Sequence, residues 1–445
     1  MRIALIDYKD PVVGFANRDQ TGGFGSGMHA HGMVGKLVTK LKKTGLRLPV
    51  LNLGYLCAIG RAAGHEVNFY TGMPDGEDII VLASSMHHYR YERDFAREIK
   101  QRFPRAKIGF IGPFSSEFPE RFEAVSDFII LGEPEEIFEQ ICRGNIEAVG
   151  RIVAPGKVDV NRLPFPDWKG FDLDSYGYAP ILPRKPFLTI QASRGCPFAC
   201  EFCPYLVQQG VPLRRRDNDR IVAEMEYLVR EYGIKSLLFR DITWSMNKKL
   251  SKELCKRIAD KQFDLDIGVE TRADTLDEEL ILLMSKANIK VVNLGIESPE
   301  NDILSDSGRK PIKKDKLEET IRLLEKNGIQ VQAFYIIGLI DDDEDSVKKT
   351  IRYSHQLNTF TAQFCVLTPF PGTKTYGDLK DRITTTDFAR FTEYEPVVGI
   401  DGLSAEKIRH YLNRAFNSYY MRTMWLYKHG FNAFLSVVRQ MARIR

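Results

Sequence analysis

The first 150 residues alternate short apolar runs with segments of helical spacing. The apolar runs are Ile3–Asp7, Glu66–Tyr70, Asp78–Ala83, Lys107–Gly112 and Phe128–Gly132. Each run has the continuous apolar character of a parallel strand that is covered on both faces. The helical segments between them are Leu51–Ala63, Glu92–Arg102 and Glu135–Arg143. This alternation predicts a doubly wound, Rossmann-like α/β domain, whose ligands bind at the carboxyl ends of the strands.

The same alternation restarts at Phe187. The predicted strands are Phe187–Ala192, Ser236–Asp241, Asp266–Arg272, Val291–Glu297, Val331–Gly338 and Ala362–Thr368. The predicted helices are Asp219–Glu231, Lys248–Lys261, Asp277–Ala287, Lys313–Lys326 and Asp345–Gln356. These six strand–helix units are fewer than the eight of a closed TIM barrel, so we expect an open, partial (β/α)6 barrel. Its active site is expected at the carboxyl ends of the strands.

A passage rich in Pro, Asp and aromatic residues, Leu163–Pro186, separates the two halves. Its prolines exclude a continuous helix or a central strand, which favours an extended linker. The predicted organisation is a Rossmann-like domain (1–150), a linker (151–186), the partial barrel (187–375) and a helical C-terminal region (376–445). In that last region Ser404 is the expected N-cap. Its last twenty residues mix apolar residues with Arg and Lys, which is compatible with packing on the barrel or with membrane contact.

A Gly-rich insertion, Thr21–Gly35, follows the first predicted strand, where such a domain places a binding loop. Its glycines do not form a phosphate-loop motif, and we interpret the insertion as a flexible or substrate-covering loop.

Composition narrows the class of protein without identifying it. The chain has 445 residues, 43% hydrophobic and 27% charged, which is typical of a globular protein with two or three domains. A net charge of +4 is too small to indicate a nucleic-acid partner. No apolar run approaches the roughly 20 residues of a membrane-spanning helix, and the first residues lack the pattern of a signal peptide. We therefore expect a cytoplasmic protein without a transmembrane segment.

Three of the seven cysteines lie within eight residues, in the segment SRGCPFACEFCPY. Cys196, Cys200 and Cys203 follow the first predicted barrel strand, and soft thiolates of this kind bind iron–sulfur clusters, zinc or copper. Zinc normally takes a fourth protein ligand, and the nearby sequence offers neither Cys nor His for it. Three thiolates on a cubane cluster leave one iron open for another ligand. A zinc loop completed by a distant His, or three unrelated buried cysteines, remain the alternatives.

The spacing CxxxCxxC at these positions resembles the signature of the radical S-adenosylmethionine (SAM) superfamily. The resemblance implies that Cys196, Cys200 and Cys203 hold a 4Fe–4S cluster. It also implies that the amine and carboxylate of SAM chelate the open iron, and that one electron cleaves the sulfonium to a 5′-deoxyadenosyl radical. A protein of this family needs an electron donor such as flavodoxin or ferredoxin.

The same resemblance assigns SAM-binding roles at the ends of the first three predicted barrel strands. Phe202 is expected against the adenine, and Asp241 is expected to accept hydrogen bonds from the methionyl ammonium. Arg272 is expected to pair with the methionyl carboxylate through its planar guanidinium. Glu270 lies two residues earlier on the same strand and so faces the same side.

Two further positions follow the next strands. Glu297, in LGIESPE, resembles the family's segment near the ribose, and Gly338, in FYIIGLIDD, allows close backbone approach to adenine. Cys365, on the sixth predicted strand, is a candidate for donating a hydrogen atom or binding substrate; the alternative is a buried structural thiol.

The N-terminal domain and the LPFP linker resemble the cobalamin-binding subclass of radical SAM enzymes, the class B methylases. The similar passages are residues 49–67 (PVLNLGYLCAIGRAAGHEV) and 131–136 (LGEPEE). The DxHxxG motif of several cobalamin proteins is absent, and residues 111–120 lack the double glycine often seen there. The histidines at 29, 31, 87 and 88 are either ligands at the strand ends or ordinary loop histidines.

The resemblance implies a radical SAM enzyme that functionalises an unactivated C–H bond of a small molecule. Cobalamin-dependent methyl transfer in the biosynthesis of a lipid, a tetrapyrrole or a natural product such as an antibiotic precursor is the expected reaction. The alternatives are a dehydratase, rearrangement or cyclisation enzyme that does not bind cobalamin, and a non-catalytic metal-binding module.

Overall fold

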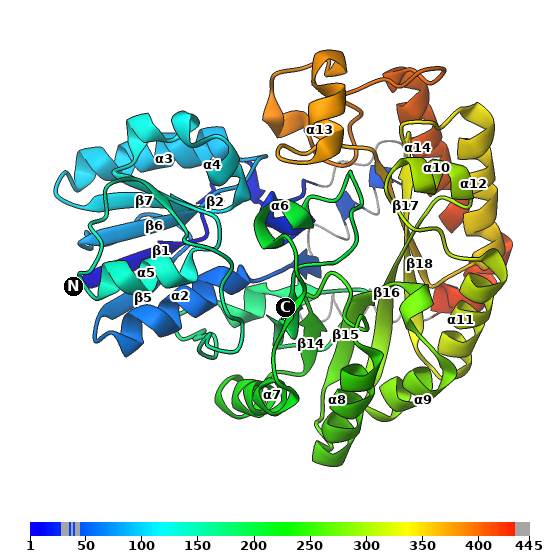
Figure 1. Cartoon of the computed structure of the whole chain (residues 1–445), viewed down its shortest axis with the longest axis horizontal. Coiled ribbons are helices and arrows are strands. Elements are labelled where there is room, and N and C mark those ends of the chain that lie inside the picture. The colour runs from blue at the N-terminus through cyan, green and yellow to red at the C-terminus, as the bar shows by residue number, and fades with distance from the viewer. Residues whose placement is uncertain (28–34, 37–38, 41–44, 432–445) are drawn as a thin grey trace.

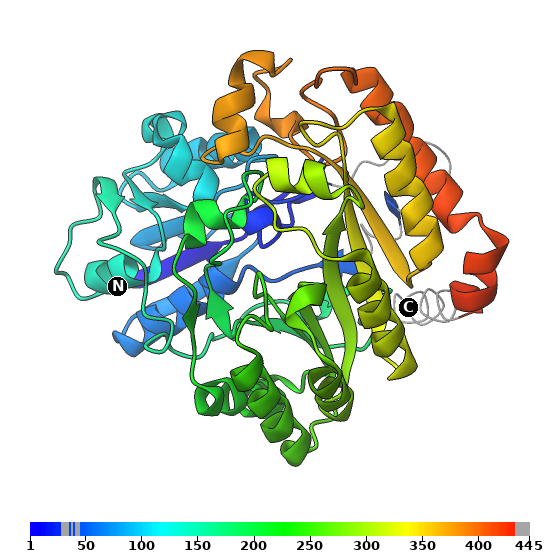
Figure 2. The same ribbon diagram turned by 45° about the vertical axis from the view of Figure 1, so that its right-hand side comes forward.

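The computed structural model of the chain describes residues 1–27, 35–36, 39–40 and 45–431. Two six-stranded parallel sheets dominate it, one in each half of the chain (Figure 1). The helices of the C-terminal half cover the outer side of its sheet, and the N-terminal sheet lies beyond its inner side (Figures 1 and 2).

The N-terminal sheet has the strand order β5-β1-β6-β7-β8-β9. Its strands are β1 (Arg2–Ile6), β5 (Glu66–Tyr70), β6 (Ile79–Ala83), β7 (Lys107–Ile111), β8 (Phe128–Leu131) and β9 (Gly150–Val153). Its helices are α2 (Leu51–Ala62), α3 (Tyr89–Arg102), α4 (Pro113–Glu117) and α5 (Glu135–Cys142). The strand order reverses between β1 and β6, which makes the carboxyl ends of these two strands the switch point of the sheet.

Alternate residues of β1 enter two different cores. Ile3 and Leu5 pack with α2 and α5, whereas Ala4 and Ile6 pack with α3 and α4. Helices on both faces explain why the predicted strands are uniformly apolar. The five strands and three helices predicted in this half are confirmed, and with them the doubly wound fold. The strand β9 was missed because it is a mostly exposed edge strand and lacks a buried apolar run.

The C-terminal sheet is parallel and open, with the order β11-β14-β15-β16-β17-β18. Its strands are β11 (Phe187–Ile190), β14 (Ser236–Phe239), β15 (Asp266–Thr271), β16 (Ile289–Glu297), β17 (Gln330–Ile337) and β18 (Thr361–Val366). The helices between them include α7 (Asn218–Tyr232), α8 (Lys248–Lys261), α9 (Glu278–Lys286), α10 (Asn301–Asp306), α11 (Lys314–Lys326) and α12 (Glu344–Leu357). The partial (β/α)6 barrel is confirmed, since β11 and β18 are the two edges and do not pair.

Short elements complete the architecture. The two-residue strands are β2 (Lys9–Asp10), β3 (Gly14–Phe15), β4 (Leu46–Arg47), β10 (Gly177–Tyr178), β12 (Ser193–Arg194) and β13 (Arg214–Arg215). The 3-10 turns are η1 (Thr21–Gly23), η2 (Pro119–Arg121), η3 (Glu123–Val125), η4 (Leu173–Ser175), η5 (Ala273–Thr275), η6 (Lys380–Arg382) and η7 (Phe388–Arg390). In the linker, β10 pairs with β4 and places Tyr178 beneath the barrel strands.

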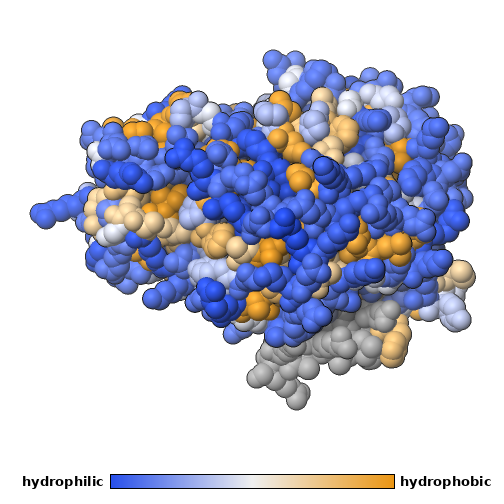
Figure 3. Space-filling model, turned by 60° about the horizontal axis from the view of Figure 1, so that its bottom comes forward, coloured by the Kyte–Doolittle hydropathy of each residue, from blue (hydrophilic) through white to orange (hydrophobic). Residues whose placement is uncertain are grey.

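The C-terminal region is helical where it is described, with α13 (Lys374–Leu379), α14 (Ala405–Tyr420), α15 (Thr423–Trp425) and a π-helical turn, Leu426–Gly430. Ser404 caps α14 as expected, since its side chain accepts a hydrogen bond from the Lys407 amide. The prediction for residues 432–445 lies outside the described residues. Figure 3 shows a largely hydrophilic surface with scattered apolar side chains. None of the described helices has the length and apolar character needed to cross a membrane.

Candidate active site

The three cysteines lie on a loop that a two-stranded ribbon closes. Arg194 of β12 stands opposite Arg214 of β13 in this antiparallel ribbon, and residues 195–213 form the loop, including the short helix α6 (Tyr205–Gln209). Gly195 has a φ of +84°, and a Cβ there would lie 2.6 Å from the Pro212 carbonyl oxygen. Only glycine allows the two backbone segments to approach this closely. The turn at Gly195 then leads the chain into the cysteine loop.

The loop faces a large chamber of about 1030 Å³. Cys196, Cys200 and Cys203 line it together with residues at the carboxyl ends of the barrel strands. The loops that follow β1 and β6 form its N-terminal wall, through residues such as Phe15 and His87. One space therefore joins the cysteine loop to the switch point of the N-terminal sheet.

The structure brings most of the predicted site residues to this chamber. The lining includes Phe202, Glu270, Arg272, Glu297 and Cys365. In the described part of the chain, no three His, Cys, Asp or Glu side chains converge in the geometry of a metal site. The three thiols share the chamber wall.

Two predicted residues lie elsewhere. Asp241 is fully buried and accepts hydrogen bonds from the Ala192 amide (2.9 Å) and the Ser193 hydroxyl (2.5 Å), so it supports the start of the cysteine loop. Burial raises the pKa of Asp241 to about 6. Gly338 packs beneath α14, where a Cβ would meet the Ile408 side chain at 2.9 Å. Neither residue is on the chamber wall.

Arg272 has the geometry of a carboxylate-binding residue. Its Nε and Nη2 donate to Asp274 at 2.9 and 3.1 Å, and Nη2 also donates to the Lys310 carbonyl. The guanidinium carbon lies 4.4 Å from the centre of the Phe198 ring in the cysteine loop. Its Nη1 is buried and has no hydrogen-bond partner among the described residues. A ligand carboxylate would satisfy this donor, so Arg272 fits the methionyl end of SAM.

Arg309 is a site residue that the sequence did not reveal. It follows α10, donates to the Gly295 carbonyl (2.6 Å) and lies 3.3 Å from the Glu297 carboxylate. Its positive charge also lies close to the thiols of Cys200 and Cys203. Its sequence context, SDSGRK, has no strand end or motif that would have indicated a buried role.

The deep wall of the chamber is polar. Tyr178 donates to the Gln332 amide oxygen (3.0 Å) and accepts from Asn293 (3.0 Å). The Asn293 Oδ1 is buried without a partner among the described residues. On β18, the Gln363 side-chain amide donates to the Cys365 sulfur at 3.7 Å. This wall offers hydrogen bonds to a ligand that carries hydroxyl or amine groups.

Two of the four candidate histidines are among the described residues. His87 and His88 line the chamber, and the His87 Nε2 lies 3.1 Å from the Gly25 carbonyl oxygen. His29 and His31 lie outside the described residues.

Comparison with known proteins identifies the barrel. Residues 190–353 match the model of the Radical SAM superfamily. This part of the chain is therefore a radical SAM domain, of the superfamily whose members use a 4Fe–4S cluster and SAM. The two-domain fold of the chain is shared with a solved radical SAM methyltransferase.

Three relatives illustrate this placement. An uncharacterized methyltransferase of Pyrococcus horikoshii is 27% identical over 425 residues, which cover 86% of this chain and 91% of that protein. The anaerobic magnesium-protoporphyrin IX monomethyl ester cyclase of Rubrivivax gelatinosus is 26% identical over 74% of this chain and 65% of the cyclase. The radical SAM methyltransferase TsrM of Kitasatospora setae, solved with cobalamin and a 4Fe–4S cluster, has a TM-score of 0.64. It is 15% identical, and the match covers 85% of this chain and 77% of TsrM.

Proposed function

We propose that this chain cleaves SAM reductively to a 5′-deoxyadenosyl radical and uses it for cobalamin-dependent methyl transfer to an unactivated carbon of a small molecule. The observation that carries the proposal is the single chamber, which joins the cysteine loop of the barrel to the switch-point loops of the N-terminal sheet. A radical source and a methyl carrier have to face the same substrate, and this space allows both to do so.

The chain's own residues have distinct roles in this proposal. Cys196, Cys200 and Cys203 would hold the 4Fe–4S cluster, whose chemistry when bound would be one-electron reduction of the sulfonium. Arg272 binds the methionyl carboxylate with its unpartnered Nη1. Phe202 would pack against the adenine, and Glu297, which lies 3.3 Å from Arg309, would lie beside the ribose. A small electron-transfer protein such as flavodoxin or ferredoxin supplies the electron.

Cobalamin would occupy the N-terminal side of the chamber, between the loops after β1 and β6 and the cysteine loop. The chamber has a volume of about 1030 Å³, which supports the presence of a second large ligand beside SAM. The methyltransferase relative supports methyl transfer, and the fold shared with TsrM, which was solved with cobalamin, supports cobalamin as the methyl carrier. We assign no histidine as a cobalt ligand.

The substrate proposed for this site carries hydroxyl or amine groups. A lipid tail would leave the polar groups of the deep wall, among them the unpartnered Asn293 Oδ1, without hydrogen bonds. This favours a polar natural product, such as an antibiotic precursor, over a lipid.

A second candidate function is a cobalamin-independent reaction of the substrate radical, such as dehydration, rearrangement or ring closure. The similarity to a cyclase supports ring closure as the reaction, and the missing DxHxxG motif is compatible with an N-terminal domain that does not bind cobalamin. Both functions share the cysteine loop and the SAM-binding residues, and they differ in the methyl carrier.

Anaerobic reconstitution of the full-length chain tests both candidates. Formation of 5′-deoxyadenosine on reduction, with cobalamin retained and S-adenosylhomocysteine released, supports methyl transfer. Deoxyadenosine without cobalamin retention supports the second candidate. Cys200→Ala should form no deoxyadenosine, whereas Cys255→Ala, which removes a thiol of α8 outside the chamber, should keep it. Deoxyadenosine from Cys200→Ala at the wild-type rate would refute the cluster assignment.

A further inference from the structure

The ribbon that closes the cysteine loop brings two positive charges together. Arg194 and Arg214 are direct register partners in the β12–β13 pair. Their side chains are only 3% and 13% exposed, so water screens their repulsion poorly. Like charges directly opposite each other destabilise an antiparallel pair. A ribbon of two residues on each strand has few other interactions to offset this repulsion.

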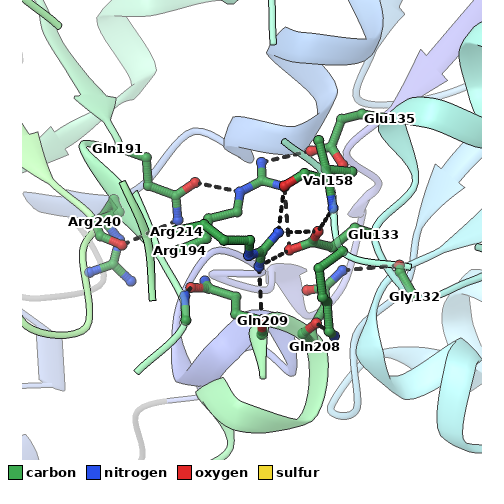
Figure 4. A network of polar contacts seen from close by, with 12 residues as sticks. Gly132, Glu133, Glu135, Val158, Gln191, Arg194, Gln208, Gln209, Arg214 and Arg240 are labelled. Atoms are coloured by element: carbon green, nitrogen blue, oxygen red, sulfur yellow. Dashed lines mark hydrogen bonds and ion pairs between the residues drawn. The ribbon is translucent and has the colours of Figure 1, made fainter. Parts of the chain in front are cut away.

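Two carboxylates of the N-terminal domain neutralise the pair (Figure 4). Glu133, which follows β8, accepts hydrogen bonds from Arg214 Nη1 and Nη2 at 2.7 and 2.8 Å and lies 3.7 Å from Arg194. Glu135, the first residue of α5, accepts from Arg194 at 2.7 Å. The Val158 amide donates to Glu133 at 2.7 Å and orients it. Both carboxylates are almost fully buried.

The barrel itself supplies only neutral partners to the two guanidiniums among the described residues. Arg194 donates to the Gln191 amide oxygen (2.9 Å), and Arg214 donates to the Gln209 carbonyl (2.9 Å). The charge balance of the ribbon therefore comes from the other domain.

The same network extends into the backbone of the loop. Gln209, whose carbonyl binds Arg214, accepts a hydrogen bond from the Gly195 amide at 3.2 Å through its side chain. The Cys196 amide donates to the Gly210 carbonyl at 3.1 Å. The position of the first cysteine thus depends on the closure of the ribbon.

We propose that Glu133 and Glu135 are positioning residues that close the cysteine loop by neutralising the Arg194–Arg214 pair. The N-terminal domain then has a role besides holding a methyl carrier: it sets the place of the cluster ligands. This inference rests on the proposed cluster-binding role of the three cysteines and is independent of the reaction that follows SAM cleavage.

The full-length chain tests the inference with three variants. Glu133→Gln removes the central charge. Glu136→Gln is the matched control, because Glu136 is the exposed neighbour of Glu135 in α5. The double variant Glu133→Gln/Arg214→Gln restores the balance, since Arg194 keeps its partner Glu135.

Three measurements need no substrate and no cobalamin. They are hydrogen exchange of residues 195–213 before cluster loading, iron and sulfide retained after reconstitution, and the electron paramagnetic resonance spectrum of the reduced cluster with SAM. In Glu133→Gln we expect exchange at least tenfold faster, less than half of the wild-type iron and an altered spectrum. Glu136→Gln should match the wild type, and the double variant should recover at least half of each loss.

Two results would overturn the inference. One is a Glu133→Gln variant that matches Glu136→Gln in exchange, iron and spectrum. The other is a double variant that is no better than Glu133→Gln, because charge balance would then not be the cause. If Glu133→Gln fails to fold, the double variant must fold and bind iron for the inference to stand.

Discussion

Gly308 lies directly against Ala199 of the cysteine loop: a Cβ at position 308 would stand 2.6 Å from the Ala199 carbonyl oxygen. The neighbouring Ser307 carbonyl accepts a hydrogen bond from the Glu201 amide at 3.1 Å. The turn after α10 therefore supports the middle of the loop, between the first and third cysteines, while the ribbon fixes its ends.

This contact predicts that Gly308→Ala impairs cluster binding. The φ of +66° costs any alanine about 1 kcal/mol, and the Cβ must in addition displace the loop backbone. Gly328→Ala is the matched control, because its φ is +74° and no atom lies within 4 Å of the added Cβ. We expect iron retention to fall at least twofold for Gly308→Ala and to stay at the wild-type level for Gly328→Ala. Equal retention in the two variants would contradict the contact.

Arg272→Lys is predicted to weaken SAM binding more than it slows cleavage. Lysine keeps the charge but loses the planar fork and the free Nη1 donor. A lost hydrogen bond to a charged group amounts to roughly tenfold or more in affinity. We expect KM for SAM to rise by about that factor in the deoxyadenosine assay, with a smaller change in kcat. Arg257→Lys, at an exposed surface pair, should leave both constants unchanged.

The N-terminal domain is predicted to depend on Arg18. This arginine is 1% exposed and pairs with Asp7 at 2.5 Å and Glu92 at 2.7 Å. Arg18→Met leaves the buried Glu92 without a cation and leaves Asp7 with only Arg47, 3.4 Å away, which costs about 3–5 kcal/mol. Arg97→Met breaks a surface pair with Asp94 and should cost less than about 1 kcal/mol. Denaturant unfolding of the two variants measures the difference, and similar losses would argue against the buried triad.

Asp342 predicts a specific pH dependence of stability. It accepts hydrogen bonds from the Gly338 and Leu339 amides, yet burial raises its pKa to about 6. The folded state holds the Asp342 proton more tightly than the unfolded state does. The protonated carboxyl therefore adds to the free energy of unfolding, fully below about pH 4, and this stabilisation is lost as the pH rises through about 6. About two pKa units correspond to about 3 kcal/mol.

Asp342→Asn removes this titration. The unfolding free energy of the wild type minus that of the variant should therefore fall by about 3 kcal/mol between about pH 4 and about pH 7. Guanidinium unfolding at the two pH values gives this difference directly. A difference that does not change with pH would show that Asp342 titrates normally.

The order of strands and helices was predictable because it depends on local patterns of apolar residues. The cysteines were also predictable, since all three lie within eight residues and share one loop. Arg272 and Glu297 reach the chamber because a strand delivers its last residues to the carboxyl edge of the sheet.

The positions of the other site residues could not be predicted, because they depend on tertiary contacts. Asp241 lies two residues after the end of β14, and its carboxylate accepts a hydrogen bond from the Ala192 amide, away from the chamber. Gly338 likewise follows the end of a strand, and α14, more than sixty residues later, packs over it. Arg309 reaches the cysteines through a turn that has no periodic pattern. In each case the partner is distant in the sequence, and a single sequence does not specify it.

The opposition of Arg194 and Arg214 has a consequence for how such enzymes diversify. A barrel that carries both arginines cannot be grafted onto a foreign N-terminal domain unless that domain brings its own pair of acids to the junction. Under our proposal, an N-terminal domain without those acids would leave the two arginines unneutralised, so the barrel and the acid-bearing junction have to be kept together.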